Sequence, residues 1–284
     1  MNRYLSKDYW TQLASDFGRS DGKGFAPVLH PGTPVWFNEA IDGLQSSAWD
    51  RVLDRCELGK SALVLDVGCG TGRWLRRGGQ RGLSAVGIDQ SLAMLRLARE
   101  RETRSPLFVG EIQNLPFLDE SFDCVSAITV IQHIPSAQQG QALEEMVRVL
   151  RPGGHLILFE LIRGHGPHVF SRKPADWIFQ VSSLGLNLVL WFGQEFLLLD
   201  RSLMALLLCL RGVAARRASQ TLPGKSQDAS GRSGPHLFVK RIYWTLRRLS
   251  VVSSVWIEPL VARICPKALA THGVFLFQKK KAVR

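Results

Sequence analysis

The stretch LVLDVGCGTGRW, residues 63–74, decides the fold of this chain. Its first residues, 63–67, belong to an apolar run that begins at residue 61. The length and β-branched content of this run, 61–67, are typical of a buried strand. Gly68, Gly70 and Gly72 follow in a loop, and the residues after them have a helical pattern. A strand, a glycine loop and a helix in this order are typical of the ligand-binding edge of an open parallel sheet, because glycines let a ligand approach the backbone.

The residues that follow repeat this alternation of strands and helices. Apolar runs predict strands at 83–89, 106–111, 122–129 and 154–160. Helices are predicted at 90–104, where Ser91 is a suitable N-cap, and at 138–150. Two further strands are predicted at 252–258 and 273–280. This alternation predicts an α/β fold, a doubly wound and mostly parallel sheet with helices on both faces.

The positive charge of the chain is concentrated in its last third. The 284 residues carry a formal net charge of +12, yet residues 201–284 hold 16 of the 36 Lys and Arg and only 2 of the 24 Asp and Glu. That segment therefore has a net charge of +14, against −2 for residues 1–200. With 45% hydrophobic and 21% charged residues, the composition is that of a globular protein and excludes a disordered or collagen-like chain.

Cysteine usage and hydropathy indicate a cytoplasmic protein. The five cysteines are scattered without a Cys-x-x-Cys pair, so neither a disulfide framework nor a metal site is expected. The first ten residues lack the apolar core of a signal peptide. The longest uncharged run, 177–194, contains several polar residues and matches a transmembrane helix poorly.

Two aspartates beside the glycine loop indicate the kind of ligand. Asp66 precedes the loop, and Asp89 ends the next predicted strand, where a carboxylate can accept both hydroxyls of a ribose. Arg73 stands where a dinucleotide fingerprint requires a third small residue, and the chain has no P-loop sequence. These features predict a nucleoside ligand that places no pyrophosphate at the loop.

Five segments together resemble the successive motifs of a known family. They are LVLDVGCGTGRW (63–74), VGID (86–89), GEIQNLPF (110–117), SFDCVSAITVIQHI (121–134) and LRPGGHLILFE (150–160). In order and spacing they are similar to the class I S-adenosylmethionine-dependent methyltransferases, in particular to the small-molecule branch. The resemblance implies a Rossmann-like methyltransferase fold with a seven-stranded sheet, S-adenosyl-L-methionine as cofactor, and a helical cap insertion.

The resemblance and the local patterns divide the chain into four parts. Residues 1–60 are expected to form an N-terminal helical lid, and residues 61–160 the cofactor-binding core. Residues 161–235 are expected to be a helical cap insertion with a flexible linker. Residues 236–284 would return to the core with a basic amphipathic helix and the closing strands.

The same resemblance assigns roles in cofactor binding to nine residues. The methionine part would lie on Gly68, Gly70 and Gly72, with Asp66 near its amino group. Asp89 would bind the ribose hydroxyls. The remaining expected contacts are Gln90 beside the adenine, Glu111 as acceptor for the adenine amino group, Ile112 against the ring, and Thr129 below the sulfonium.

A general base is sought among residues close to the expected methyl group. His133, after the fourth predicted strand, is the first catalytic candidate, and Glu160, at the end of the fifth, is the second. The alternative for His133 is local packing, and for Glu160 a capping role. The loop histidines His30, His165 and His168 are further candidates, each of which can equally be a solvated loop residue.

The acceptor is inferred by exclusion and from the expected cap. The chain lacks the N/D-P-P-Y/F sequence that binds planar amides and exocyclic amines in relatives, which disfavours methylation of an adenine or glutamine nitrogen. An oxygen acceptor on a small molecule is the leading interpretation, and the sequence does not decide whether the acceptor atom is oxygen, nitrogen or carbon. Aromatic and aliphatic side chains in the cap favour a bulky apolar substrate, unless they only form the cap's own core. They are Trp177, Phe179, Leu184, Trp191, Phe192, Phe196 and Leu197. RNA methylation through the basic last third and a catalytically inactive partner protein remain as alternatives.

The basic last third allows three interpretations. It can be a solvated charged surface, a membrane-surface contact or a nucleic-acid contact. The predicted amphipathic helix 236–249 mixes apolar and basic residues as an interfacial helix does. No recognised nucleic-acid-binding module is present, which disfavours nucleic acid as a partner. The oligomeric state is not indicated by the sequence.

Overall fold

The structure, a computed structural model, describes all residues except 1–5, 21–22, 102, 207–208, 210–233 and 282–284. By their internal contacts the residues form two compact units. The first comprises residues 1–195 and 265–284, and the second comprises residues 196–264. The predicted flexible linker, residues 219–235, lies almost entirely outside the described residues.

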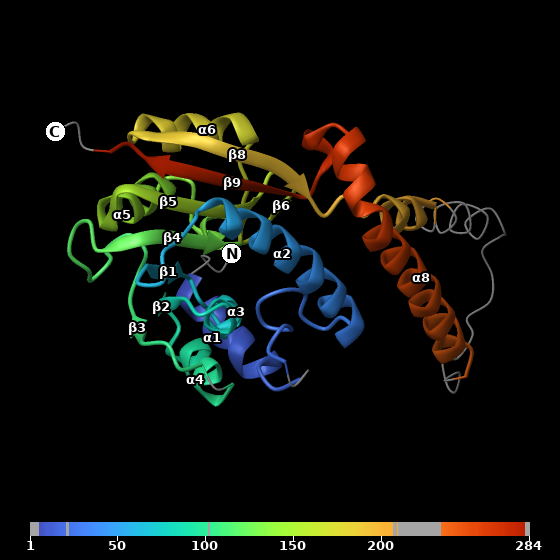
Figure 1. Ribbon diagram of the computed structural model, residues 1–284. Coiled ribbons are helices and arrows are strands. Elements are labelled where there is room, and N and C mark those ends of the chain that lie inside the picture. The colour runs from blue at the N-terminus through green and yellow to red at the C-terminus, as the bar shows by residue number, and fades with distance from the viewer. Residues whose placement is uncertain (1–5, 21–22, 102, 207–208, 210–233, 282–284) are drawn as a thin grey trace. The chain divides into compact units, whose positions relative to one another are not determined.

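The first unit is built around one seven-stranded sheet (Figure 1). Its strands are β1 (Leu63–Val67), β2 (Ser84–Asp89), β3 (Leu107–Val109), β4 (Phe122–Ile128), β5 (Leu150–Leu161), β8 (Leu186–Gln194) and β9 (His272–Lys279). They lie in the order β3-β2-β1-β4-β5-β9-β8. The first five are parallel to one another, and β9 runs antiparallel between β5 and β8. The predicted α/β class and mostly parallel sheet are confirmed.

Helices flank this sheet, and a short hairpin follows β5. The helices are α1 (Ser6–Phe17), α2 (Val35–Arg55), α3 (Arg73–Gln80), α4 (Leu92–Glu100), α5 (Gln139–Val149) and α6 (Pro174–Ser183), and the hairpin is β6 (His165–Gly166) with β7 (Val169–Phe170). The apolar side of α2, with Trp49 and Val52, packs in one core cluster with side chains of β1, β4, β5 and β9. The expected cap of α4 is confirmed, because the Ser91 hydroxyl accepts the Met94 N–H.

The structure corrects the prediction for the outer strands. Residues 186–194, expected within a helical cap, are strand β8 of the main sheet. Residues 252–258, expected to be a strand, lie inside helix α8 (Gly234–Ile264). Two turns of this helix bury Val251, Ser254 and Glu258, whose spacing of three and four is helical. In a run this short, apolar residues alone do not distinguish the two-residue period of a strand from the 3.6-residue period of a helix.

The second unit also changes the predicted domain boundaries. Residues 198–206 are helical, and α8 follows at Gly234–Ile264. The Glu258 carboxylate accepts the backbone N–H groups of Phe196 and Leu197, which ties α8 to the start of the unit. Only residues 265–284 of the expected return segment belong to the sheet unit. None of the described helices is long and apolar enough to cross a membrane.

Candidate functional site

A cavity of about 330 Å³ lies where the first strands of the sheet end. The glycine loop after β1, the ends of β2 and β4, and the loop after β3 line it, together with α1. Eight of the predicted site residues line this cavity: Gly68, Gly70, Asp89, Gln90, Glu111, Ile112, Thr129 and His133. Asp66, Gly72 and Glu160 do not line it. The sheet therefore brings most of the predicted residues together at one edge, as expected for an open parallel sheet.

The glycine loop has a backbone that other residues adopt only with strain. Gly68, Gly70 and Gly72 have φ angles of 66°, 52° and 73°, in the left-handed region that glycine enters at little cost. A Cβ on Gly68 would lie 2.5 Å from Cγ2 of Val130, which borders the cavity. Bare backbone at this position is therefore required by both conformation and space.

Asp89 connects the glycine loop to the second strand. Its Oδ2 accepts the Gly70 N–H at 2.9 Å, and its Oδ1 accepts the Ser91 N–H at 2.8 Å. Burial raises the pKa of Asp89 above its usual value, although these two backbone hydrogen bonds oppose the shift. A carboxylate oxygen can accept more than one hydrogen bond, so each oxygen keeps capacity for a ligand hydroxyl.

Asp66 is buried beneath the loop with one oxygen unused. Oδ1 accepts the Ser126 hydroxyl at 3.1 Å, whereas Oδ2 has no hydrogen-bond partner among the described residues. Burial raises the pKa of Asp66 to about 7, against the hydrogen bond from Ser126 and the charge of Arg73. A buried acceptor without a partner is costly and rare in folded proteins. Because Asp66 does not line the cavity, its contact with the amino group of the implied cofactor, directly or through water, stays a prediction.

Helix α1 closes one side of the cavity. Ser6, Lys7 and Trp10 of α1 line it. The helix is fastened to the cofactor-binding half, because the Gln90 side chain donates to the Ser6 hydroxyl at 2.6 Å and the hydroxyls of Thr11 and Ser91 are 3.1 Å apart. The predicted N-terminal lid thus has side chains in the cavity wall.

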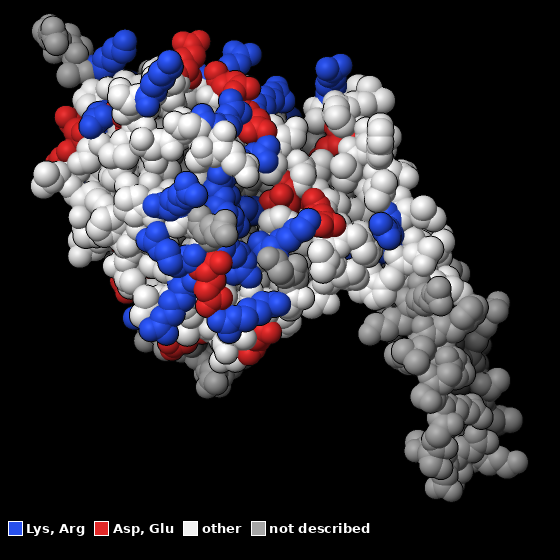
Figure 2. Space-filling view, turned by 60° about the horizontal axis from the view of Figure 1, so that its bottom comes forward, with Lys and Arg blue, Asp and Glu red and all other residues white. Residues whose placement is uncertain are grey.

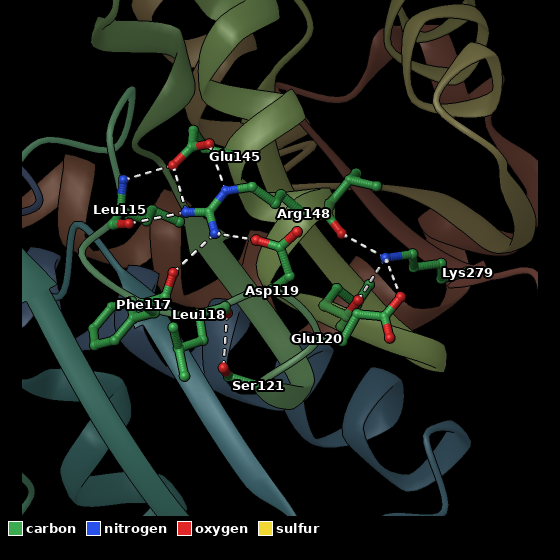
Figure 3. A network of polar contacts seen from close by, with 11 residues as sticks. Leu115, Phe117, Leu118, Asp119, Glu120, Ser121, Glu145, Arg148 and Lys279 are labelled. Atoms are coloured by element: carbon green, nitrogen blue, oxygen red, sulfur yellow. Dashed lines mark hydrogen bonds and ion pairs between the residues drawn. The ribbon is translucent and has the colours of Figure 1, made fainter.

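The loop that carries Glu111 and Ile112 is held in place by Arg148 of α5 (Figure 3). The Arg148 guanidinium donates to the backbone oxygens of Leu115 and Phe117 at 2.9 and 2.8 Å, and it pairs with Glu145 at 2.7 Å. Glu145 in turn accepts the Leu115 N–H at 2.8 Å. Hydrogen bonds that Arg148 donates to the carboxylates of Glu145 and Asp119 raise the pKa of Arg148 above its usual value. Sequence reasoning missed this arginine, since no local motif marks it.

Replacing Arg148 with alanine is expected to loosen this loop. Two backbone oxygens and the Glu145 carboxylate lose their donor, which costs about 1–3 kcal/mol of unfolding free energy. The affinity for S-adenosylhomocysteine should fall with it, because Glu111 and Ile112 are no longer fixed. Chemical denaturation and calorimetry measure the two effects. Arg96→Ala, on the exposed side of α4, is the control, and equal behaviour of both variants would contradict the role of Arg148.

Thr129 and Glu160 shape the turn after β4. Thr129 has a φ of 58°, unusual for a branched residue, and its hydroxyl donates to the Ile128 oxygen. The Glu160 carboxylate accepts the backbone N–H groups of Val130, Ile131 and Gln132 at 3.2, 3.0 and 2.9 Å. Burial raises the pKa of Glu160 to about 7 despite these donors. Because Glu160 does not line the cavity, the structure favours the capping role over the catalytic one.

His133 borders the cavity as predicted, but its ring nitrogens are engaged. Nδ1 lies 2.9 Å from the backbone oxygen of His168, so Nδ1 carries the proton of the neutral ring. Nε2 lies 3.2 Å from the Gln132 side-chain nitrogen, whose amide is oriented because its oxygen accepts the Leu161 N–H. Burial lowers the pKa of His133 to about 4. A neutral ring with both nitrogens engaged fits positioning better than proton removal.

The other candidate histidines lie in different places in the structure. The ring of His168 stacks on Tyr9 at 4.4 Å, and its Nε2 lies 3.0 Å from the Tyr9 hydroxyl. Trp10 meets His133 edge to face at 4.9 Å. These contacts hold α1 against the cavity wall. His30 packs on Phe37 instead and does not line the cavity, and His165 lies in strand β6.

The aromatic residues expected to surround the substrate do not do so. None of the seven residues named for the cap lines the cavity. Trp177 of α6 and Phe196 are fully buried, and Phe192 of β8 joins the core cluster on the sheet. Phe179 is 78% exposed, so these residues divide between core and surface and do not form one core of the cap.

A buried polar network, also missed from the sequence, connects the glycine-loop helix to the far strands. Arg73 at the start of α3 donates to Asp42 at 2.9 Å and to Gln45 at 2.6 Å. Gln45 donates to Glu195 at 2.8 Å, and Nδ1 of His272 lies 3.1 Å from the same carboxylate. Burial would raise the pKa of Glu195, yet its partner His272 holds it below the usual value. In the sequence, Arg73 is evidence only against a dinucleotide site. The structure gives it a structural role as well, as a donor in this network.

A basic face lies near α3 and α4. Figure 2 shows lysine and arginine side chains gathered there, with acidic ones among them. A second cavity of about 500 Å³ on this side is lined by Lys23, Arg73, Arg76, Arg77 and Arg101, with Asp42 and Glu100. Among the described residues, Arg76 and Arg101 form no ion pair, whereas Arg77 pairs with Asp50. No group of His, Cys, Asp and Glu in the described part of the chain could hold a metal ion.

Comparisons with known proteins agree with this geometry. Residues 65–158 match the family model described as a methyltransferase domain. A relative from Homo sapiens, named "Probable tRNA methyltransferase 9B", is 40% identical over 133 residues, which cover 46% of this chain and 28% of the relative. A relative from Erwinia pyrifoliae, named "Malonyl-[acyl-carrier protein] O-methyltransferase", is 28% identical over 215 residues, which cover 75% of this chain and 78% of the relative.

A solved structure shows the same fold. The "[4+2]-Cyclase SpnF" matches with a TM-score of 0.59 at 19% identity, over 97% of this chain and 95% of the other. At this identity the likeness concerns the fold, and the printed activity is that of the other protein. The family match and the ordered motifs around the cavity show that residues 65–158 form a methyltransferase domain of the class I S-adenosylmethionine-dependent type.

Proposed function

We propose that this chain transfers a methyl group from S-adenosylmethionine to an oxygen atom of a small, bulky and apolar molecule. The observation that carries the proposal is the cavity of about 330 Å³, in which the glycine loop, Asp89 and the turn after β4 meet. Its volume is in the range of small-molecule sites. Side chains of α1 form part of its wall, which favours a small acceptor over a polymer.

The residues present fit the cofactor. Oδ2 of Asp66, which has no hydrogen-bond partner among the described residues, would accept from the amino group directly or through water. The left-handed glycines leave room along the backbone, and Asp89 is oriented by two N–H groups. The bound cofactor supplies a methyl group already activated on a sulfonium, so the protein mainly aligns two reactants, which can contribute about 7–11 kcal/mol. Thr129 and His133 border the part of the cavity nearest the turn after β4.

Different observations support an apolar acceptor molecule and an oxygen as the acceptor atom. Trp10, Val130, Ile134 and Pro135 give the cavity an apolar wall beyond the glycine loop. The relative matched over three quarters of both chains is named an O-methyltransferase. His133, neutral through burial and engaged at both ring nitrogens, would position the acceptor beside the turn by packing against it, and the acceptor's proton would leave to water or to another group.

Transfer of a tritiated methyl group tests this function. The purified chain is incubated with labelled cofactor and an extract of the organism that encodes it, and the label is followed into the solvent-extractable fraction. The proposal expects a labelled, extractable product that disappears with Asp89→Ala. A chain that binds S-adenosylhomocysteine but labels no fraction would instead be the inactive partner protein. Label confined to RNA or protein would reject the small-molecule acceptor.

RNA methylation is the second candidate. Two observations favour it: the human relative is named a probable tRNA methyltransferase, and the second cavity on the basic face is lined by Arg76 and Arg101, which form no ion pair among the described residues. RNA binding through this face would weaken steeply with salt, because phosphate contacts release counterions. Filter binding over a salt series decides it, and weak binding that does not change with salt would exclude this candidate.

A further inference from the structure

Helix α8 of the second unit has an unusual distribution of side chains. In an ordinary amphipathic helix the apolar stripe is buried and the polar face is exposed. The buried side of α8 instead includes Ser254 and Glu258, which accept backbone N–H groups of residues 196–200. Val251 and Val261 complete this inward side. The unit therefore holds α8 largely by polar contacts.

The opposite side of α8 is apolar and exposed. We call it the outer stripe, and it consists of Ile242, Leu246, Leu249, Trp256, Leu260 and Ile264. At about 100° per residue these six side chains fall within an arc of about 80°. Trp256 is 81% exposed, Ile264 71% and Leu249 62%. Single exposed apolar side chains are normal, whereas a continuous row marks an interaction surface.

The charges on α8 indicate what this surface contacts. Arg263 is exposed about 20° from one edge of the outer stripe, and Arg248 is exposed on the same flank, about 80° from that edge. The only acidic residue of α8, Glu258, is buried on the other side. A second copy of the chain would bring this cationic helix against itself without any exposed carboxylate of α8 to pair with. An anionic lipid surface complements both the charge and the apolar row.

We propose that α8 lies on the surface of an anionic membrane, with its outer stripe among the lipid chains and Arg248 and Arg263 at the headgroups. Trp256, an amphipathic side chain, would sit at the boundary between them. This extends the contact expected at 236–249 to Ile264. The proposal is independent of methyl transfer.

Sedimentation of the full chain with vesicles tests the proposal. Vesicles of phosphatidylcholine alone are compared with vesicles in which part of this lipid is replaced by phosphatidylglycerol. The wild type should bind the anionic vesicles more strongly. Trp256→Gln should lower this binding about tenfold, since it removes one large apolar side chain from the contact. Arg248→Gln combined with Arg263→Gln should reduce the preference for anionic vesicles.

The matched control is Phe179→Gln, since this aromatic residue of α6 is 78% exposed and lies in the other unit. It should bind vesicles like the wild type. Leu260→Gln is the substitute if Trp256→Gln lowers the melting temperature. No vesicle binding by the wild type, or equal binding by Trp256→Gln and Phe179→Gln, would overturn the proposal. So would a dimer that Trp256→Gln dissociates without changing vesicle binding.

Discussion

Asp89→Ala is expected to lower the affinity for S-adenosylhomocysteine by at least about a hundredfold. The carboxylate has two tasks, because it accepts the N–H groups of Gly70 and Ser91 and faces the cavity with its remaining capacity. Each hydrogen bond to a charged group contributes about 1.5–3 kcal/mol, so the loss of two ribose contacts alone reaches that factor. Isothermal titration calorimetry measures the change.

The control for Asp89→Ala is Asp54→Ala. Asp54 also lies in the first unit, but its side chain is 62% exposed and pairs with Arg81 at the surface. This variant should bind S-adenosylhomocysteine like the wild type, because exposed ion pairs contribute little. If both variants retain wild-type affinity, Asp89 is not a cofactor ligand.

Gly68→Ala is expected to cost roughly 2–5 kcal/mol of unfolding free energy, the sum of a left-handed backbone penalty and an overpacked contact. The φ of 66° disfavours any Cβ, and the added carbon would lie 2.5 Å from Val130 Cγ2. If the loop shifts to relieve the contact, cofactor binding is lost instead. Denaturant unfolding and calorimetry on the same preparation record whichever effect occurs.

Gly79→Ala is the control for Gly68→Ala. It tests whether the expected loss of stability is specific to the glycine loop or follows any replacement of glycine by alanine. Gly79 lies in α3, its φ is not in the left-handed region, and a Cβ there would meet nothing within 4 Å. Gly79→Ala should stabilise the chain by roughly 0.5–1 kcal/mol, since alanine loses less backbone freedom. A wild-type result for Gly68→Ala would contradict the described loop geometry.

The central strands could be predicted because each combines an apolar run with a nearby turn signal. The run 61–67 and its glycines identify β1 and the loop without any distant information. The outer strand could not be assigned in this way. Residues 186–194 become a strand through pairing with β9, which is some 80 residues away, whereas 252–258 continue a helix whose inward side is defined by contacts to residues 196–200.

The candidate site shows the same division between local and distant signals. Gly68, Asp89 and Ile112 could be placed because they lie in motifs with fixed spacing. The capping role of Glu160 depends on three N–H groups about 30 residues before it. Arg148 acts on a loop about 30 residues before it. No local motif in a single sequence identifies side chains that bridge separate elements.

The cavity beside the glycine loop is expected to hold the methionine-bearing cofactor. Calorimetric titration of the wild-type chain with S-adenosylhomocysteine measures this binding, above pH 7, where Asp66, with a pKa of about 7, is ionised. We expect saturable binding with one site per chain. Binding should be weaker below pH 7, since a protonated Asp66 no longer attracts the amino group. The absence of saturable heat at either pH would show that this cavity does not hold the cofactor.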